Sequence, residues 1–235
     1  MAIRNTFKLF SRLTIQSAGR IPSSRQGIVR QWFSLLSPTG LASRFLAVIA
    51  VSGFMFSSAG AAEVGEDGLH IQPWFMDSFL DLRDDLQELT AQGKRFAVIW
   101  EQRGCPYCRE THEVNFAEKR IADYIKANFG VLQLNMWGSR KVTDFDGEEL
   151  EERALAQKWR VIYTPTIVFF GDKLPAEATS ANMEVMRMPG YFKRFHFMSM
   201  FEYVAANAYK DQPFQRFIQH KFDELKAKGI KPDIW

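Results

Sequence analysis

The sequence predicts an α/β layered sandwich, in which helices cover a central β-sheet. Short β-prone runs alternate with segments of helical periodicity in the order β-α-β-α-β-β-α, and further helical segments flank them. Turn-forming residues separate these runs. At 235 residues and 46% apolar content, the chain has enough material for one such domain or a small pair.

The charge of the chain is divided unevenly along its length. Residues 1–62 contain seven Arg or Lys and no Asp or Glu, although the whole chain has a net charge of only +3. The body that follows carries 23 basic and 27 acidic side chains, a net charge of −4. Its charge therefore argues against a nucleic-acid binder.

The amino end has the composition of a secretory leader. Arg44 precedes the apolar run 45–56, and small residues follow up to a predicted cleavage site near Ala61. The run is shorter than the roughly 20 residues needed to span a bilayer. Residues 1–40 form an unusually long, Arg- and Ser-rich extension, which also fits an organellar transit peptide. We expect export, with a leader over 1–62 and one domain over 63–235.

The first elements of that domain lead up to its only two cysteines. Residues 74–89 predict an amphipathic helix, with Asp77 or Ser78 as its cap and Gly93 just past its end. Its apolar positions recur every three or four residues: Phe75, Phe79, Leu82, Leu86 and Leu89. The apolar run 96–100 predicts the first strand.

The middle of the domain continues the alternation. Residues 114–129 predict a helix, with Asn115 as a break, and 131–136 predict the second strand. A loop over 138–147 leads to a third helix over 148–159.

The last third begins with strands and ends in helices. Residues 166–170 predict a strand, and 184–188 a further one. Residues 192–209 and 213–228 then predict two helices, the second with one apolar stripe.

Cys105 and Cys108 stand where a strand gives way to a helix. A sulfur at a helix start faces unpaired N–H groups, so we expect the pKa of Cys105 to fall below the ~8.5 of free cysteine. Pro106 suits the first helical position. Cys108, one turn later, can resolve a mixed disulfide on Cys105, which is the division of labour that thiol–disulfide exchange requires. A passive disulfide is the plainer alternative, but a two-residue gap constrains the unfolded chain very little.

Two neighbouring features have both a chemical and a plain interpretation. A cis Thr164–Pro165 bond would leave nearby backbone free to pair with an extended peptide, whereas a trans proline at a strand edge is commoner. We expect the cis form beside the cysteine pair. His112 completes a possible copper or zinc site with Cys105 and Cys108, or is a surface histidine.

The motifs that carry a family likeness are Glu101-x-x-Gly104-Cys105-Pro106-Tyr107-Cys108, His112, Tyr163-Thr164-Pro165-Thr166 and Met188-Pro189-Gly190-Tyr191. Together they resemble the thioredoxin superfamily, and most closely the periplasmic thioredoxins of bacterial sulfur-oxidation clusters (SoxW-type). The resemblance spans residues 74–209. It implies the thioredoxin fold, a central mixed β-sheet flanked by helices, here with an additional C-terminal helix.

The resemblance also assigns roles. It implies that Cys105 is the nucleophile, Cys108 the resolving residue and Pro165 the cis-proline, with Pro106, Tyr107 and Thr164 as supporting residues. Thioredoxins carry a buried aspartate six residues before the first cysteine, where this chain has Ile99. Glu101 is the nearest carboxylate. It either assists proton transfer from Cys108 or lies on the surface.

The sequence thus predicts a monomeric periplasmic oxidoreductase that reduces disulfides or cysteine adducts of client proteins. The resemblance implies a membrane thiol transporter as its electron donor, and sulfur-carrier proteins as clients. No cofactor is expected beyond the Cys105–Cys108 disulfide. The departure at Ile99 leaves the direction of electron flow open, so a disulfide oxidant or isomerase is an alternative. A copper or zinc carrier using both cysteines and His112 is the non-enzymatic alternative.

Overall fold

The computed structural model describes residues 62–232. The predicted leader and its cleavage site near Ala61 lie outside these residues. None of the helices formed by the described residues is long and apolar enough to cross a membrane.

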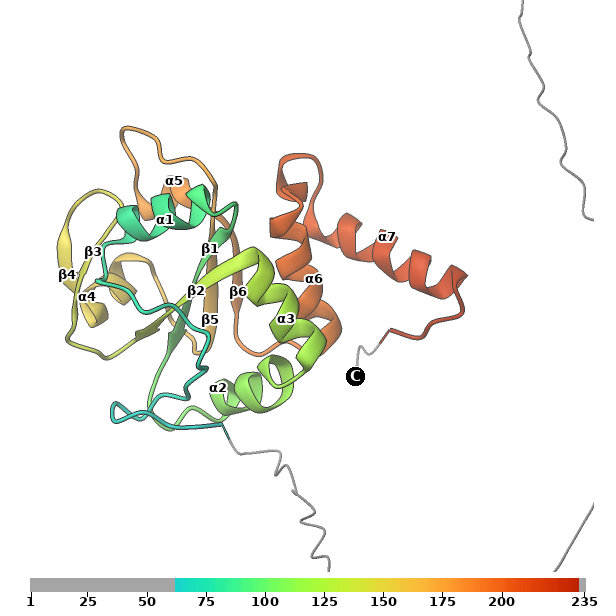
Figure 1. The fold of residues 1–235 in the computed structure, drawn as a ribbon, viewed down its shortest axis with the longest axis horizontal. Coiled ribbons are helices and arrows are strands. Elements are labelled where there is room, and N and C mark those ends of the chain that lie inside the picture. Colours follow the sequence, from blue (N-terminus) through green and yellow to red (C-terminus); the bar gives the residue numbers. More distant parts are fainter. Residues whose placement is uncertain (1–61, 233–235) are drawn as a thin grey trace, which may run out of the picture. The chain divides into compact units, whose positions relative to one another are not determined.

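A four-stranded mixed sheet forms the centre of the domain (Figure 1). Its order is β2-β1-β5-β6, with β2 at Phe129–Asn135, β1 at Arg95–Glu101, β5 at Thr166–Phe170 and β6 at Glu184–Pro189. β1 runs parallel to β2 and antiparallel to β5, and β6 is antiparallel to β5. A mixed sheet flanked by helices, with an added C-terminal helix, confirms the predicted fold class.

Two groups of helices cover the two faces of this sheet (Figure 1). One face packs against α1 (Leu82–Ala91), α4 (Glu152–Lys158) and the short α5 (Ser180–Met183). The other packs against a π-helical turn (Thr111–Phe116), α3 (Lys119–Asn128) and α6 (Arg194–Ala205). The remaining elements are α2 (Pro106–Glu110), a 3-10 turn (Ala208–Lys210), α7 (Phe214–Ala227) and a separate hairpin of β3 (Lys141–Thr143) and β4 (Glu149–Glu151).

Strand β1 is buried on both faces, which explains its nearly continuous apolar sequence. Phe96, Val98 and Trp100 point into the core on the α1 side, and Ala97 and Ile99 into the core on the α3 side. Side chains alternate along a strand. Glu101, two residues after Ile99, therefore falls on the α3 side, where it meets His112 of the π-helical turn.

The first helix begins later than predicted. α1 starts at Leu82, and Asp81 rather than Asp77 or Ser78 caps it by accepting hydrogen bonds from Arg83 N and Asp84 N. Trp74 and Phe75 pack against the core on the α3 side, whereas Leu82 lies in the core on the α1 side. One helix cannot face both cores, so the chain must cross between them. Phe79, predicted to be apolar core, is fully exposed.

Before α1, the chain runs along β2 in an irregular path. Met76 N–H donates to Val131 O at 2.9 Å, and Gln133 Nε2 donates to His70 O at 2.7 Å. These bonds attach residues 70–76 to the outer strand of the sheet.

The third predicted helix is also shorter than expected. Residues 149–151 pair with β3, and α4 begins only at Glu152. A turn at Gly147, where φ is +85°, reverses the chain into this hairpin. Lys158 then reaches back to Asp144, Asp146 and Glu148 at 2.7, 2.6 and 3.0 Å. Burial opposes the charge of Lys158, but these hydrogen bonds to carboxylates outweigh it and raise its pKa.

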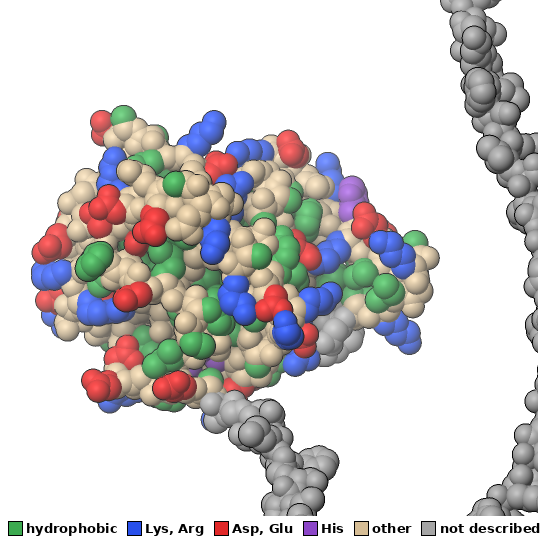
Figure 2. Space-filling view, in the orientation of Figure 1, with side chains coloured by type: hydrophobic (Ala, Val, Ile, Leu, Met, Phe, Trp, Pro, Cys, Tyr) green, Lys and Arg blue, Asp and Glu red, His purple; other side chains and the backbone are tan. Residues whose placement is uncertain are grey.

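The predicted C-terminal helix is present as α7 and packs against α6. The ring of Tyr203 contacts Phe214 and Phe217 edge-on, at centroid distances of 5.4 and 5.3 Å. No residue of α7 is fully buried. On the face displayed in Figure 2, basic and acidic side chains are interspersed.

Candidate active site

The two cysteines form a disulfide at the start of α2, as the strand-to-helix spacing predicts. Cys105 is the N-cap of α2, and its Sγ accepts a hydrogen bond from Cys108 N at 3.0 Å. Pro106 occupies the first turn, where its missing N–H costs nothing. Cys105 retains 5% of its surface and Cys108 none, so Cys105 is the more accessible of the two.

The Thr164–Pro165 peptide bond is cis, as predicted. It places Thr164 against Cys105: the hydroxyl donates to Cys105 Sγ at 3.4 Å, and the carbonyl oxygen lies 3.5 Å from the same sulfur. Residues 59 positions apart in the sequence thus meet at the disulfide.

Large exposed side chains surround this point. Tyr107, Ile162, Tyr163 and Trp137 are 58%, 72%, 62% and 63% exposed. Tyr107 stacks on Tyr191 with ring centroids 6.3 Å apart. Trp137 Nε1 donates to Gln102 Oε1 at 2.7 Å, which holds the exposed indole beside the cysteine turn. We name Tyr107, Trp137 and Tyr163 the aromatic rim; the aliphatic Ile162 is the neighbour of Tyr163 in the sequence.

Sequence reasoning missed Trp137 and Ile162. Ile162 sits two residues before Thr164, so its adjacency to the Thr-Pro pair was an available signal. Trp137 follows β2, whose carboxyl end lies beside that of the parallel strand β1, and this pairing was the only clue to its position.

Glu101 is fully buried, which excludes the surface interpretation. Its Oε1 lies 3.0 Å from His112 Nε2, and its Oε2 accepts a hydrogen bond from Gln133 Nε2 at 2.6 Å. Because both oxygens have partners, this buried carboxylate is fully satisfied.

His112 is 1% exposed, so the surface-histidine interpretation is wrong. Its Nε2 faces Glu101 and its Nδ1 lies 3.2 Å from Gln72 Nε2. Both ring nitrogens therefore have protein partners. Within residues 62–232, no group of three or more His, Cys, Asp or Glu side chains is arranged to hold a metal ion.

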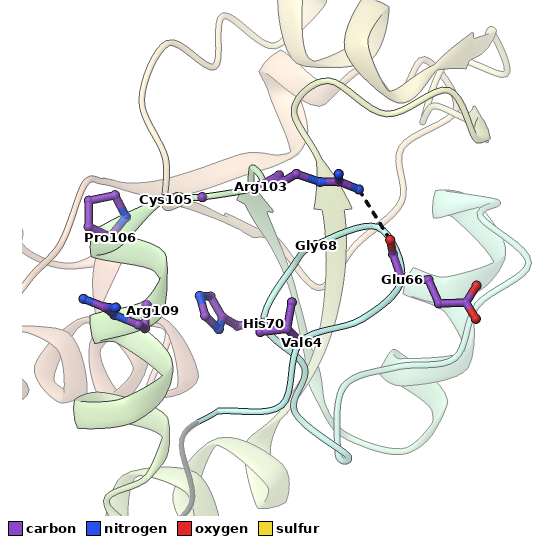
Figure 3. A pocket seen from close by; sticks show the side chains of 9 residues that line it. Val64, Glu66, Gly68, His70, Arg103, Cys105, Pro106 and Arg109 are labelled. Atoms are coloured by element: carbon purple, nitrogen blue, oxygen red, sulfur yellow. Dashed lines mark hydrogen bonds between the residues drawn. The ribbon is translucent and has the colours of Figure 1, made fainter.

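A cleft of about 570 Å³ opens beside Cys105 (Figure 3). Residues 64–70 form one wall, and the cysteine turn with the start of α2 forms the other. Arg103 ties the two together by donating to Asp67 O at 3.2 Å and to Glu66 O at 3.4 Å. Gly68, with φ of +81°, permits this approach, because a Cβ there would lie 2.6 Å from Arg103 Nε.

The sequence model of a family described as "Thioredoxin-like domain" matches residues 82–205, which is more than half of the chain. The chain belongs to the thioredoxin-like family. The matched residues include the disulfide, Glu101, His112 and the cis-proline. They exclude residues 62–81, which supply Gln72 and one wall of the cleft.

Among solved structures, this thioredoxin-like chain is similar to a thioredoxin-fold protein from Helicobacter pylori, at 24% identity and a TM-score of 0.44 over 56% of this chain and 86% of that one. It is also similar to a thioredoxin from Thermus thermophilus, at 25% identity and a TM-score of 0.41 over 53% and 83% of the two chains.

Among curated proteins, it matches the UPF0273 protein of Pyrococcus furiosus, at 28% identity over 44% of this chain. The chain spans only 36% of the length of that relative.

Proposed function

We propose that this protein is a thiol–disulfide oxidoreductase that reduces disulfides of client proteins. The observation that carries the proposal is the Cys105–Cys108 pair at the start of α2, with Thr164 of the cis peptide against the more accessible sulfur. A passive disulfide would need neither the accessible first cysteine nor this neighbour.

The reaction is two successive exchanges. The Cys105 thiolate attacks one sulfur of the client disulfide, a mixed disulfide forms, and the other client sulfur leaves as a thiolate that takes up a proton. Cys108, after losing its proton, then attacks the Cys105 sulfur. The client is released with both sulfurs reduced, and Cys105 and Cys108, which supplied the two electrons, are now joined as a disulfide.

The aromatic rim supports protein clients rather than only small thiols. Exposed, rigid aromatic side chains supply contact area at low entropic cost, and Trp and Tyr are enriched where proteins bind. We propose that the rim docks the client segment around its disulfide. Export to the periplasm, a membrane thiol donor and clients among sulfur-carrier proteins complete the proposal, and rest on the leader and the SoxW-type motifs.

Replacing each cysteine separately tests this function. Cys105→Ser should abolish reduction of a protein disulfide such as insulin by dithiothreitol-recycled enzyme. Cys108→Ser should instead accumulate a mixed disulfide with the client, detectable by mass spectrometry. Retention of reductase activity in Cys105→Ser would overturn the proposal.

The equilibrium potential decides the direction of electron flow. We expect a value near −270 mV, typical of a reductant, whereas a value near −120 mV would favour the oxidant alternative. Stoichiometric copper or zinc in the reduced protein, lost in His112→Ala, would favour the carrier. The engagement of both His112 nitrogens by Glu101 and Gln72 speaks against that alternative.

A further inference from the structure

A chain of hydrogen-bonded side chains runs from the segment before α1 to the carboxylate of Glu101; Trp74 and Gln72 are half-buried, and His112 and Glu101 are buried. Trp74 Nε1 lies 3.1 Å from Gln72 Oε1, and Gln72 Nε2 lies 3.2 Å from His112 Nδ1. His112 Nε2 in turn lies 3.0 Å from Glu101 Oε1. Trp74, Gln72 and His112 all lie outside β1, the strand that carries Glu101.

The direction of every bond in this chain can be assigned from its ends. An indole nitrogen can only donate, so Gln72 Oε1 is the acceptor and the Gln72 amide nitrogen faces His112. That nitrogen can only donate, so His112 Nδ1 must be the unprotonated acceptor. The single ring proton is then on Nε2, from which it is donated to Glu101.

The direction of the hydrogen bond to the other oxygen of Glu101 can be assigned in the same way. Gln133 Nε2 faces His70 O at 2.7 Å and Glu101 Oε2 at 2.6 Å, and both of these oxygens accept. Glu101 therefore receives one donor on each carboxylate oxygen, His112 on Oε1 and Gln133 on Oε2, and its orientation is fixed from both sides.

The pair of Glu101 and His112 meets on the helical segment that follows Cys108. Cys108 and His112 are four residues apart on one helical segment, and both are fully or almost fully buried. Among the described residues, the titratable ring of His70 lies 5.5 Å from that of His112. The pair also contacts the neutral Gln72 and Gln133 and the rings of Phe75 and Phe116.

We propose that His112 and Gln72 are positioning residues for the resolving step: Gln72 fixes the proton of His112 on Nε2, and His112 holds Glu101 as the acceptor of the Cys108 proton. The inference rests on the proposed function and deepens it. The Cys108 S–H bond breaks as the proton passes to Glu101. The new Cys108–Cys105 bond then forms while the Cys105–client bond breaks and the client thiolate leaves.

One stopped-flow experiment separates the two exchanges. Reduced protein mixed with excess 5,5′-dithiobis(2-nitrobenzoate) releases one coloured thiolate when Cys105 attacks and a second when Cys108 resolves. Gln72→Leu and His112→Leu should slow the second phase about 10-fold at pH 7, because Glu101 loses its oriented donor. The first phase should change less than about two-fold in every variant, because Cys105 does not use the pair.

Conservative and distant variants provide the controls. His112→Gln keeps an amide donor towards Glu101 and should stay within about three-fold of the parent in the second phase. Gln92→Leu removes an exposed glutamine bonded only to Glu88 of α1 and should have no effect. If His112→Gln is as slow as His112→Leu, or if Gln72→Leu leaves the second phase unchanged, the inference is overturned. Absence of the first phase in the parent would instead overturn the proposed function.

The tautomer gives a readout that does not depend on activity. In ¹⁵N-labelled oxidised protein, His112 should show a protonated Nε2 and an unprotonated Nδ1, and Gln72→Leu should lose this fixed state. A proton on Nδ1 in the parent protein would overturn the assignment.

Discussion

The hydroxyl of Thr164 donates a hydrogen bond to Sγ of Cys105 at 3.4 Å, the only polar contact that a side chain outside the cysteine motif makes with the disulfide among the described residues. Sulfur accepts more strongly as a thiolate than in a disulfide. This contact should therefore stabilise the reduced protein more than the oxidised one.

Thr164→Val removes that donor while keeping the shape of the side chain. The reduced form should lose about 1 kcal/mol of stabilisation, which lowers the potential by roughly 20 mV. Equilibration with glutathione, read by thiol alkylation, measures the shift. Thr90→Val, at an exposed position of α1, is the control and should not move the potential. A higher potential in Thr164→Val would contradict the prediction.

Trp137→Ser tests the aromatic rim. We expect kcat/KM for a protein disulfide to fall about 10-fold, because a docked tryptophan commonly contributes more than 1 kcal/mol to binding. Reaction with 5,5′-dithiobis(2-nitrobenzoate) should be unchanged, since a small disulfide needs no docking. Phe79→Ser removes a fully exposed aromatic residue before α1 and should affect neither substrate. Equal losses on both substrates would place Trp137 in the chemistry instead.

Asp85 predicts a pH dependence of stability. Burial raises its pKa from 3.8 to about 6, against the opposing hydrogen bond that Ser78 donates to it, and the charges of Asp81, Glu88 and Asp84 add to the rise. The folded protein therefore binds this proton more tightly than the unfolded chain. The resulting stabilisation is fully present below about pH 4 and is lost as the pH rises through 6.

Asp85→Asn should consequently increase the free energy of unfolding at pH 7 by about 1 kcal/mol, and by much less at pH 4. Urea denaturation at the two pH values measures the difference. Asp84→Asn, exposed on the same turn, should change stability by less than about 0.5 kcal/mol. A gain in Asp85→Asn that is equal at both pH values would show that the side chain acts through something other than its ionisation.

Lys158→Met tests the cluster that closes the β3–β4 hairpin. Asp144 is fully buried, and it would keep its hydrogen bonds from Trp159 Nε1 and Phe145 N but lose its counter-charge. We expect a loss of about 2 kcal/mol in the free energy of unfolding, since breaking one side of a buried pair strands the other charge. The exposed pair of Lys119 and Asp123 is the control: Lys119→Met should cost less than about 0.5 kcal/mol.

Local signals were sufficient for the four strands of the central sheet and for the placement of the cysteine pair at a helix start. β5 begins and ends where its β-branched run predicts. The helix predicted over 114–129 is interrupted at residues 117–118 rather than at Asn115, which lies inside the π-helical turn and donates from Nδ2 to Phe192 O at 2.8 Å. The cis bond at Pro165 was predicted only because the Thr-Pro pair occurs in the same chain as the cysteine motif; taken alone, a trans bond would have been expected. A few adjacent residues or a known motif were enough to predict the strands, the cysteine pair and the cis bond.

Features that depend on which face of the sheet a segment packs against could not be predicted from the sequence. The periodicity of residues 74–89 is compatible with one helix, and nothing local shows that Trp74 and Leu82 belong to opposite cores. Residues 149–151 contain mostly charged side chains, and they form a strand only because β3 lies opposite them. The burial of His112 follows from Glu101 and Gln72, which are distant in sequence.

The attachment of residues 70–76 to β2 has a consequence for solubility as well as for chemistry. β2 is the terminal strand of the sheet, and the bond from Met76 N–H to Val131 O covers part of its open side. An edge strand with unpaired backbone N–H and C=O groups can form hydrogen bonds with a strand of another chain. A protein clipped after Met76 would therefore not only lose the partner of His112 but also expose a template for intermolecular β-pairing, so that loss of activity and self-association would arise from the same cut.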